Sequence, residues 1–507
     1  MTAGAWASRL WRALSIQVSQ TSSGFTKRSV VSSMVWSFTA ASGRGGQRSV
    51  ERGVRPTPGH RVGGRPAPGI FMAHVPTGRF KRLARLARTS ASTGMAMVRK
   101  ADDVATRVER TTEVLSNMRG MATKVGQMAS YVDGVIPDQH RAVFEKSMAR
   151  LQSRAQTSTV AEIRRVVEAD LGDRIDVLFS EWDDEPLASA SIGQVHRARL
   201  PDGRPVVVKV QHPGIREALQ ADLDNGVIVK IAIDMFGMRR LEAARFHDEI
   251  RTRFLEELDY RLEGERQQHF ARLHADDDRI HVPAVHLDYT NDRVLTTDFA
   301  EGKPFAVAMH AREEARAAWA ATLWRFVYGS MVLGGSFNAD PHPGNYLFGD
   351  DGRITFLDFG CVQEIPMERR RTIIRMHRAA ARHDWDAARD AGRRLLETRG
   401  GAYEARALDY LLKILEPVSH SPFRFTPEYV RLVVRMFKDN FKDFSKGSDD
   451  DGFVPLPEGM IFLNRLQFGF YSILARLNAE VDYAAVDAAF FERFEREHGP
   501  LADEPVG

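Results

Sequence analysis

The feature that most constrains the fold of this chain is a short segment containing Asp340, Asn345 and the triplet Asp358-Phe359-Gly360. Two apolar runs, Tyr346–Phe348 and Ile354–Leu357, lie between the asparagine and the triplet, and the sequence Gly-Asp-Asp-Gly separates them. Glycine and aspartate are common in tight turns, so the segment predicts a loop, a β-hairpin and a second loop. The two ends of such a hairpin would bring polar side chains close together.

These polar side chains predict a metal site beside a catalytic base. Asn345 and Asp358 carry the hard oxygen ligands that Mg²⁺ prefers. Asp340 stands before them, as the catalytic base does in protein kinases. The same residue types also form ordinary turns, so this segment alone does not decide between a turn and a metal site.

Length and composition restrict the other possibilities. The chain has 507 residues, enough for two or three domains, and 43% are hydrophobic, enough for a core. Lys and Arg number 71 against 67 for Asp and Glu, and the first 50 residues contain no acidic residue. The basic excess therefore gives no reason to expect nucleic-acid binding. The single cysteine, Cys361, excludes an internal disulfide and a cysteine-based zinc site, which fits a reducing compartment.

Residues 1–71 predict a basic, disordered tail. They are rich in Arg, Ser, Gly and Pro, and Trp6, Leu10, Trp11 and Leu14 fall on one face of a short helix. A basic, acid-free segment of this kind also resembles a mitochondrial presequence. Two locations therefore stay open: the cytoplasm, including the inner face of the membrane as a peripheral site, or the mitochondrion.

No segment approaches the roughly 20 apolar residues that a membrane-spanning helix needs. The best candidate is Met460–Leu477, which Arg465 and Arg476 interrupt. Its leucines and phenylalanines recur at helical spacing, so it predicts a core helix.

Upstream of the hairpin, residues 92–171 have helical patterns and contain Lys124-Val125-Gly126-Gln127. A small-residue loop, Ala188–Gly193, then precedes the apolar strand Val206–Val210. The strand contains one charged residue, Lys209. A lysine in an apolar strand is costly to bury without an anion, so its place after the loop favours a phosphate partner over an exposed edge position.

Helical sequence covers Phe246–Ala275 and includes an acidic run, Glu256–Glu263, in which Asp259 and Glu263 would share one face. The run is either a solvated surface or contains the partner of Lys209 and an acid close to the metal. The remaining expected elements are strands at Ala284–Leu287 and Arg293–Phe299, a hinge at Glu301–Pro304, and helices at Glu313–Leu333, Ala379–Arg399 and Tyr403–Leu415.

The order of these features resembles the nucleotide site of protein kinases, and their details resemble the AarF/UbiB family of atypical kinases, which includes the ADCK proteins of coenzyme Q biosynthesis. The resemblance covers about residues 95 to 440. The matching motifs are the K-x-G-Q signature at Lys124–Gln127, the alanine-rich loop at Ala188–Gln194, Val208–Gly214, Glu257-Leu258-Asp259 and Asp340–Asn345.

The resemblance implies an α+β, two-lobed protein-kinase-like fold with an N-terminal helical extension that carries the K-x-G-Q motif. After the tail, the domains would be the extension at 92–171, the N-lobe at 172–303 and a mostly helical C-lobe at 304–500.

The resemblance also implies roles for single residues. Lys209 would contact the α- and β-phosphates of ATP and pair with Glu263. Asp340 would be the catalytic base, and Asn345 and Asp358 would hold Mg²⁺.

Further residues would cover the nucleotide. Glu257 and Asp259 match the E-x-D pair of the family and would lie beside Lys124 and Gln127 as a gate over the site. The loop that takes the place of the kinase glycine-rich loop would contain Ala188, Ser189, Ala190, Ser191, Ile192, Gly193 and Gln194.

The implied activity is Mg-dependent phosphoryl transfer from ATP. Asn338-Ala339 replaces the His-Arg that precedes a protein kinase's catalytic aspartate, and no Ala-Pro-Glu follows the triplet. A peptide platform is therefore not expected, and the substrate would be a small molecule, a lipid-linked molecule or water, in isoprenoid quinone or lipid metabolism. The alternative is a non-catalytic, ATP-dependent lipid-binding chaperone. No nucleic-acid partner and no transmembrane segment are expected, and peripheral membrane contact fits either function.

Overall fold

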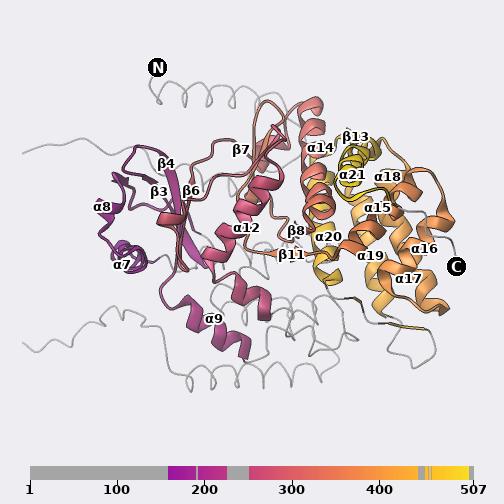
Figure 1. Cartoon of the computed structure of the whole chain (residues 1–507), viewed down its shortest axis with the longest axis horizontal. Coiled ribbons are helices and arrows are strands. Elements are labelled where there is room, and N and C mark those ends of the chain that lie inside the picture. The colour runs from indigo at the N-terminus through magenta and orange to yellow at the C-terminus, as the bar shows by residue number, and fades with distance from the viewer. Residues whose placement is uncertain are drawn as a thin grey trace, which may run out of the picture. The chain divides into compact units, whose positions relative to one another are not determined.

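A five-stranded antiparallel sheet carries the first part of the candidate site (Figure 1). The computed structural model describes residues 158–189, 192–224, 251–442, 452–454, 456–457 and 459–501. The chain divides into two units, and all the described residues belong to the second, Pro76–Gly507. The strands of the sheet are β1 (Glu181–Trp182), β2 (Ala188–Ser189), β3 (Gly193–Arg199), β4 (Pro205–Gln211) and β6 (Val294–Asp298), in the order β1-β3-β4-β6 with β2 paired to β3.

Alternation along β4 decides which side chains face which side of this sheet. Val206, Val208 and Val210 are fully buried and pack with helix α7 (Val160–Leu171) in a small aliphatic core. Because successive side chains of a strand point to opposite faces, Lys209 lies on the other face.

Two further sheets hold the segment that contains Asp340, Asn345 and Asp358. β9 (Tyr346–Phe348) and β10 (Ile354–Phe356) form the predicted hairpin, and they pair with β7 (Lys303–Pro304) and β5 (Ile280–His281) in the order β5-β10-β9-β7. β8 (Ser336–Asn338) pairs antiparallel with β11 (Val362–Glu364). The loops before β9 and after β10 therefore come together. A last pair joins β12 (Phe423–Arg424) to β13 (Glu480–Val481).

Helices form most of the remainder. Around the sheets lie α8 (Ile175–Leu178), α9 (Ile215–Asp224), α12 (Tyr260–Leu273), α13 (Phe305–Ala308) and the short η1 (Leu287–Tyr289) and η3 (Pro343–Asn345). The C-terminal set contains α14 (Glu313–Gly329), the π-helical turn η2 (Ser330–Gly334), α15 (Met367–Ala381), α16 (Trp385–Leu396), α17 (Gly401–Ile414), α18 (Glu416–Ser419), α19 (Pro427–Lys442), α20 (Met460–Leu477) and α21 (Tyr483–His498).

The core of this helical set is aromatic. Trp324 of α14 is fully buried, with its ring centroid 4.2 Å from that of Tyr328 and 4.4 Å from that of Tyr483. The sequence predicts α20 correctly over Met460–Leu477, and most of its described side chains are buried. Among the described helices, none is long and apolar enough to cross a membrane.

Three expected elements are wrong. The single helix over Phe246–Ala275 is interrupted, because residues 251–256 are helical and α12 begins at Tyr260 after an extended Asp259. The helix over Ala379–Arg399 is broken between α15 and α16, where Asp384 caps the second helix. The strand at Ala284–Leu287 is reduced to one bridge between Val285 and Thr297, followed by η1.

Two predictions fall outside the described residues. These are the tail at 1–71 and the K-x-G-Q segment with Lys124 and Gln127.

Candidate active site

A buried ion pair joins the sheet to α12. The Lys209 ammonium lies 2.8 Å from Oε1 and 2.9 Å from Oε2 of Glu263, and 3.6 Å from Oδ2 of Asp358. The Glu263 side chain is only 2% exposed. The strand lysine, the helical glutamate and the aspartate of the Asp-Phe-Gly triplet therefore meet at one point.

The surroundings of Lys209 keep it charged. Burial by itself would lower the pKa of its ammonium, but the negative charges of Asp358 and Glu263 outweigh burial and raise that pKa well above its usual range. The ammonium also lies 4.8 Å from the centroid of the Tyr260 ring, within the range of a cation–π contact. A fixed positive charge at this position is suited to an anionic ligand.

Asp259 positions the helix that carries Glu263. Its carboxylate accepts a hydrogen bond of 3.0 Å from the backbone N–H of Leu262, so it is the N-cap of α12. The expectation that Asp259 and Glu263 share a helical face is wrong, because Asp259 lies before the first turn. Glu263 then falls in the first turn, where the helix dipole stabilises a negative charge.

Three carboxylates surround the glycine of the triplet. A Cβ on Gly360 would lie 3.4 Å from Oδ1 of Asp358, 3.6 Å from Oε2 of Glu263 and 3.8 Å from Cγ of Glu257. Glu257 is 6% exposed, so it belongs to the interior of the site. The structure thus brings together Lys209, Glu263, Asp358 and Glu257.

The loop before β9 carries Asp340 and Asn345. The side-chain amide of Asn345 donates to the carbonyl oxygen of Asp340 at 3.2 Å and to its Oδ2 at 3.4 Å. The amide nitrogen therefore faces Asp340, and the Oδ1 of Asn345 is its available ligand atom. In Asp358, Oδ1 accepts from the N–H of Gly360 at 3.0 Å.

This donor set fits Mg²⁺ only in part. Asn345 and Asp358 offer an amide and a carboxylate oxygen, which are hard ligands of the kind that Mg²⁺ prefers. Among the described residues, no group of three or more His, Cys, Asp or Glu side chains is placed to hold a metal ion. A cation held by these two residues would take its other ligands from water and phosphate oxygens.

Asn338 connects the two loops of the site, a role that the sequence reasoning missed. Its Oδ1 accepts from the N–H of Asp340 at 3.0 Å, and its Nδ2 donates to the carbonyl oxygen of Asp358. Only a side chain that both donates and accepts can make this bridge. The signal in the sequence was an asparagine where protein kinases have the histidine of the His-Arg-Asp motif.

A second missed group ties α12 to the triplet. Oε2 of Glu256 accepts from Arg253 at 2.9 Å and from Arg266 at 2.7 Å, and Arg266 also donates to the carbonyl oxygen of Gly360 at 3.2 Å. Part of the acidic run is therefore neither a solvated surface nor a metal ligand. The two arginines at positions 3 before and 10 after Glu256 were the available signal.

The small-residue loop is described only in part. Ala188 and Ser189 are exposed in β2, and Ala190 and Ser191 lie outside the described residues. Gly193 is required by close packing, because a Cβ there would lie 2.4 Å from the carbonyl oxygen of Val210. Two further residues of this segment are buried: Ile192 is 8% exposed and Gln194 is 2% exposed.

Comparisons with known proteins agree with this geometry. Residues 150–391 match the model of the ABC1 atypical kinase-like domain. The chain is 31% identical over 303 residues to the mitochondrial atypical kinase COQ8 of Saccharomyces cerevisiae, covering 56% of this chain and 60% of that protein. It is 34% identical over 245 residues to the chloroplastic protein ACTIVITY OF BC1 COMPLEX KINASE 3 of Arabidopsis thaliana, covering 47% of this chain and 34% of that protein.

A solved structure supports the same fold. The complex of Rv3197 with erythromycin from Mycobacterium tuberculosis has a TM-score of 0.53 and 26% sequence identity, and the match covers 84% of this chain and 100% of that one. The fold and the paired strand lysine define the class, an atypical kinase-like domain with a protein-kinase-like α+β fold. These matches support the AarF/UbiB family, which includes the COQ8 and ADCK proteins, for residues 150–391. The chain spans between 34% and 60% of the length of the two curated relatives named above.

Proposed function

We propose that this protein binds ATP with Mg²⁺ and transfers the terminal phosphoryl group to a small-molecule or lipid-linked acceptor or to water. The observation that carries the proposal is the contact of Lys209 with both Glu263 and Asp358. Active protein kinases require this lysine–glutamate pair and the metal-binding aspartate to be in place together. The match of residues 150–391 to the ABC1 atypical kinase-like domain supports the same activity.

In this proposal each site residue has a separate role. Lys209 binds the α- and β-phosphates, and Glu263 keeps the lysine in position. Asp358 and Asn345 hold Mg²⁺, which neutralises charge on the transferred phosphoryl group when it is bound. Asp340 accepts the proton of the acceptor hydroxyl, and Asn345 orients it through the hydrogen bond between their side chains.

The acceptor is proposed to be a small or lipid-linked molecule in isoprenoid quinone or lipid metabolism. The position of the kinase arginine is taken by Ala339, which carries no charge to read a phosphorylated activation loop, and Asn338 at the histidine position bridges two loops. The names of the relatives, among them COQ8, support the metabolic setting, and the solved relative in complex with erythromycin supports a small-molecule ligand. The domain limits given above and the two locations also stay proposals.

The contribution of the metal site is tested with Asp358→Asn. This change keeps the shape of the side chain and removes its charge, so we expect affinity for ATP in the presence of Mg²⁺ to fall at least about tenfold. The matched control is Asp350→Asn, in the exposed turn of the same hairpin, where the carboxylate is 83% exposed. Calorimetric titration with ATP, with and without Mg²⁺, measures both variants. Equal Mg-dependent affinity in the two variants would contradict the assigned role of Asp358.

The reaction itself is tested by incubating the purified chain with γ-labelled ATP and a metabolite extract. A labelled small molecule or lipid supports phosphoryl transfer, and release of phosphate alone supports hydrolysis. ATP binding without transfer or hydrolysis, in a protein that also binds lipid, would instead support the chaperone alternative.

A further inference from the structure

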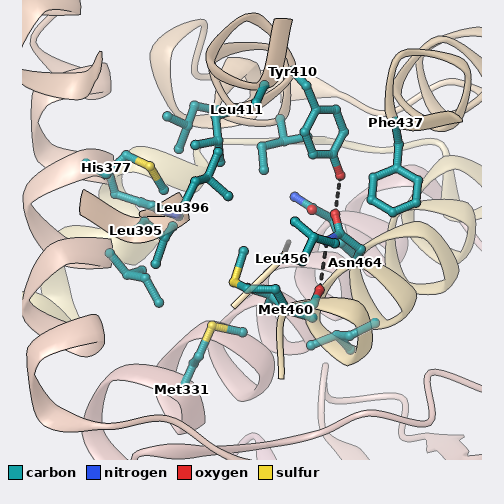
Figure 2. A pocket seen from close by; sticks show the side chains of 18 of the residues that line it. Met331, His377, Leu395, Leu396, Tyr410, Leu411, Phe437, Leu456, Met460 and Asn464 are labelled. Atoms are coloured by element: carbon teal, nitrogen blue, oxygen red, sulfur yellow. Dashed lines mark hydrogen bonds between the residues drawn. The ribbon is translucent and has the colours of Figure 1, made fainter. Parts of the chain in front are cut away.

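An apolar cavity lies among the C-terminal helices, away from the Lys209 cluster (Figure 2). Its volume is about 60 Å³. Helices α15, α16, α17, α19 and α20 contribute to its walls, together with the end of α14 and η2. Much of the lining is aliphatic, sulfur-containing or aromatic, for example Met331, Leu411, Phe437 and Leu463.

Three polar side chains in the lining are almost completely buried. His377 is 5% exposed, Asn440 is 6% exposed and Gln467 is 8% exposed. Nδ1 of His377 lies 2.7 Å from Oδ2 of Asp487, and Nε2 of Gln467 donates to the hydroxyl of Tyr471 at 3.0 Å. Between described residues, His377 makes one side-chain hydrogen bond through Nδ1, Gln467 makes one through Nε2, and none is found for the amide of Asn440.

A neighbouring asparagine shows that this lack of partners is not general. Asn464 also lines the cavity, but its Oδ1 accepts from Tyr410 at 2.5 Å and its Nδ2 donates to the carbonyl oxygen of Met460 at 2.7 Å (Figure 2). A buried polar group without a partner costs about 1–3 kcal/mol. The other three groups therefore retain unused hydrogen-bonding capacity that a bound molecule would satisfy.

The unused atoms are mainly acceptors. Asp487 also accepts from the indole N–H of Trp324 at 2.7 Å, and because a carboxylate can only accept, Nδ1 of His377 donates to it. Oε1 of Gln467 is an acceptor, the amide of Asn440 can both donate and accept, and Nε2 of His377 accepts in the neutral ring. A ligand that carries one hydroxyl donor on an apolar body matches this set.

Charge and size restrict the ligand further. None of the described lining residues is Lys, Arg, Asp or Glu, so a charged ligand would be buried without a counter-charge. A cavity needs about 10–15 Å³ to hold one water molecule, so this cavity of about 60 Å³ has room for about four to six water-sized groups. That corresponds to a chain of about five or six non-hydrogen atoms.

We propose that this cavity is a binding site for a neutral aliphatic alcohol of about five or six non-hydrogen atoms. The hydroxyl donates to one of the buried acceptors, and the alkyl body packs against Met331, Leu411 and Phe437. This site is separate from the nucleotide site, and the proposal does not depend on phosphoryl transfer.

The test uses the full chain and three probes of matched size. These are 1-pentanol, its isomer butyl methyl ether, which lacks a hydroxyl donor, and butanoate, which carries a charge. Calorimetric titration or saturation-transfer NMR measures each affinity. We expect saturable binding of 1-pentanol at one site, with the ether and butanoate at least about tenfold weaker. Equal binding of the ether would overturn the hydroxyl recognition, equal binding of butanoate would overturn the neutral ligand, and no saturable binding of 1-pentanol would overturn the site itself.

Variants place the binding in this cavity. Ala407 is 4% exposed and lines the cavity, so Ala407→Leu fills it and should weaken 1-pentanol binding at least about tenfold. Leu432→Ala, at a position that is 37% exposed on α19, is the matched control and should bind as the parent does. Cooperative melting establishes that each variant is folded, and Ala407→Val replaces Ala407→Leu if the larger side chain prevents folding. Parent-like binding in a folded, filled variant would overturn the proposal.

Discussion

The Lys209 cluster and the helical cavity differ in whether their buried polar groups have partners. Lys209 contacts both Glu263 and Asp358, so its charge is matched by opposite charges within 4 Å. The cavity keeps the amide of Asn440 buried without a partner among the described residues, and an amide carries no charge. A buried charge without a counter-charge is far more costly than a buried amide. A neutral group can therefore stay buried without a partner when no ligand is bound, and a charged group cannot.

The side chains that pack around the two sites also differ in type. The small core behind β4 consists mainly of aliphatic side chains, which leave Lys209 on the opposite face of the strand. The cavity is set in a larger, aromatic cluster around Trp324 and Tyr471. Large, rigid rings meet at many angles, and such packing can leave a void where several helices converge.

The largest expected effect tests the charged side of this comparison. Lys209→Met removes the cation that lies 2.8 Å from the buried Glu263 carboxylate, and breaking a buried pair typically costs about 3–5 kcal/mol. Lys303→Met is the control, because its partner Asp350 is 83% exposed and an exposed pair contributes about 0–1 kcal/mol. Chemical unfolding of both variants measures the difference. If both variants lose equally little free energy of unfolding, solvent screens the Lys209–Glu263 pair as it screens an exposed pair.

The double variant Lys209→Met with Glu263→Leu sharpens this result. Removing both charges should recover a large part of the stability lost in the single variant, because the buried carboxylate that faced the lysine is gone as well. No recovery would mean that the single variant fails through lost packing of the lysine chain.

An intermediate effect concerns α20, which touches both regions. It lines the cavity with Asn464 and Gln467, and Gly469 of the same helix packs against Pro341 next to Asp340. A Cβ at Gly469 would lie 2.5 Å from Cγ of Pro341. Gly469→Ala should therefore cost about 1–3 kcal/mol through overpacking and should reduce turnover of ATP by displacing the catalytic loop.

The control for this prediction is another helical glycine. A Cβ at Gly329 would meet its nearest atoms at 3.9 Å and 4.0 Å, which is ordinary contact. Gly329→Ala should stabilise the protein by about 0.5–1 kcal/mol, because alanine is the better helix former. Thermal melting and ATPase rates compare the two variants. Parent-like stability and turnover in Gly469→Ala would show that Pro341 yields without moving Asp340.

Local patterns in the sequence were sufficient for the hairpin and for α20. The hairpin follows from a turn sequence between two short apolar runs, and α20 from the recurrence of apolar residues at helical spacing. The contact of Lys209 with Glu263 joins residues 54 apart. It could be expected only through the resemblance to a family, because no local pattern encodes it.

Other features depend on tertiary contacts that periodicity does not contain. The break before α12 arises because Asp259 caps the helix, although the charged sequence around it reads as continuous helix. Glu256 is held by Arg253 and Arg266, which one helical pattern cannot distinguish from solvent-facing charges. The cavity could not be predicted either, because its lining comes from several helices whose packing decides which polar groups keep a partner.

The smallest expected effect concerns His274, a buried histidine whose Nε2, unlike that of His377, has a hydrogen-bond partner among the described residues. Nε2 of His274 lies 2.7 Å from the hydroxyl of Ser330, and burial lowers the pKa of His274 to about 4, against a smaller opposing effect from Asp277. Its folded pKa lies below the unfolded value of about 6.5, so between these values the unfolded chain binds more protons. Stability contributed by neutral His274 is therefore complete above about pH 6.5 and falls as the pH drops toward 4. At pH 6 the loss is about 1 kcal/mol.

His274→Gln, which keeps a neutral hydrogen-bonding side chain, should lose less stability between pH 7 and pH 6 than the parent. His310→Gln, at an exposed position, should match the parent. Unfolding midpoints at the two pH values measure the difference, and an unchanged pH dependence in His274→Gln would show that the acid sensitivity arises elsewhere.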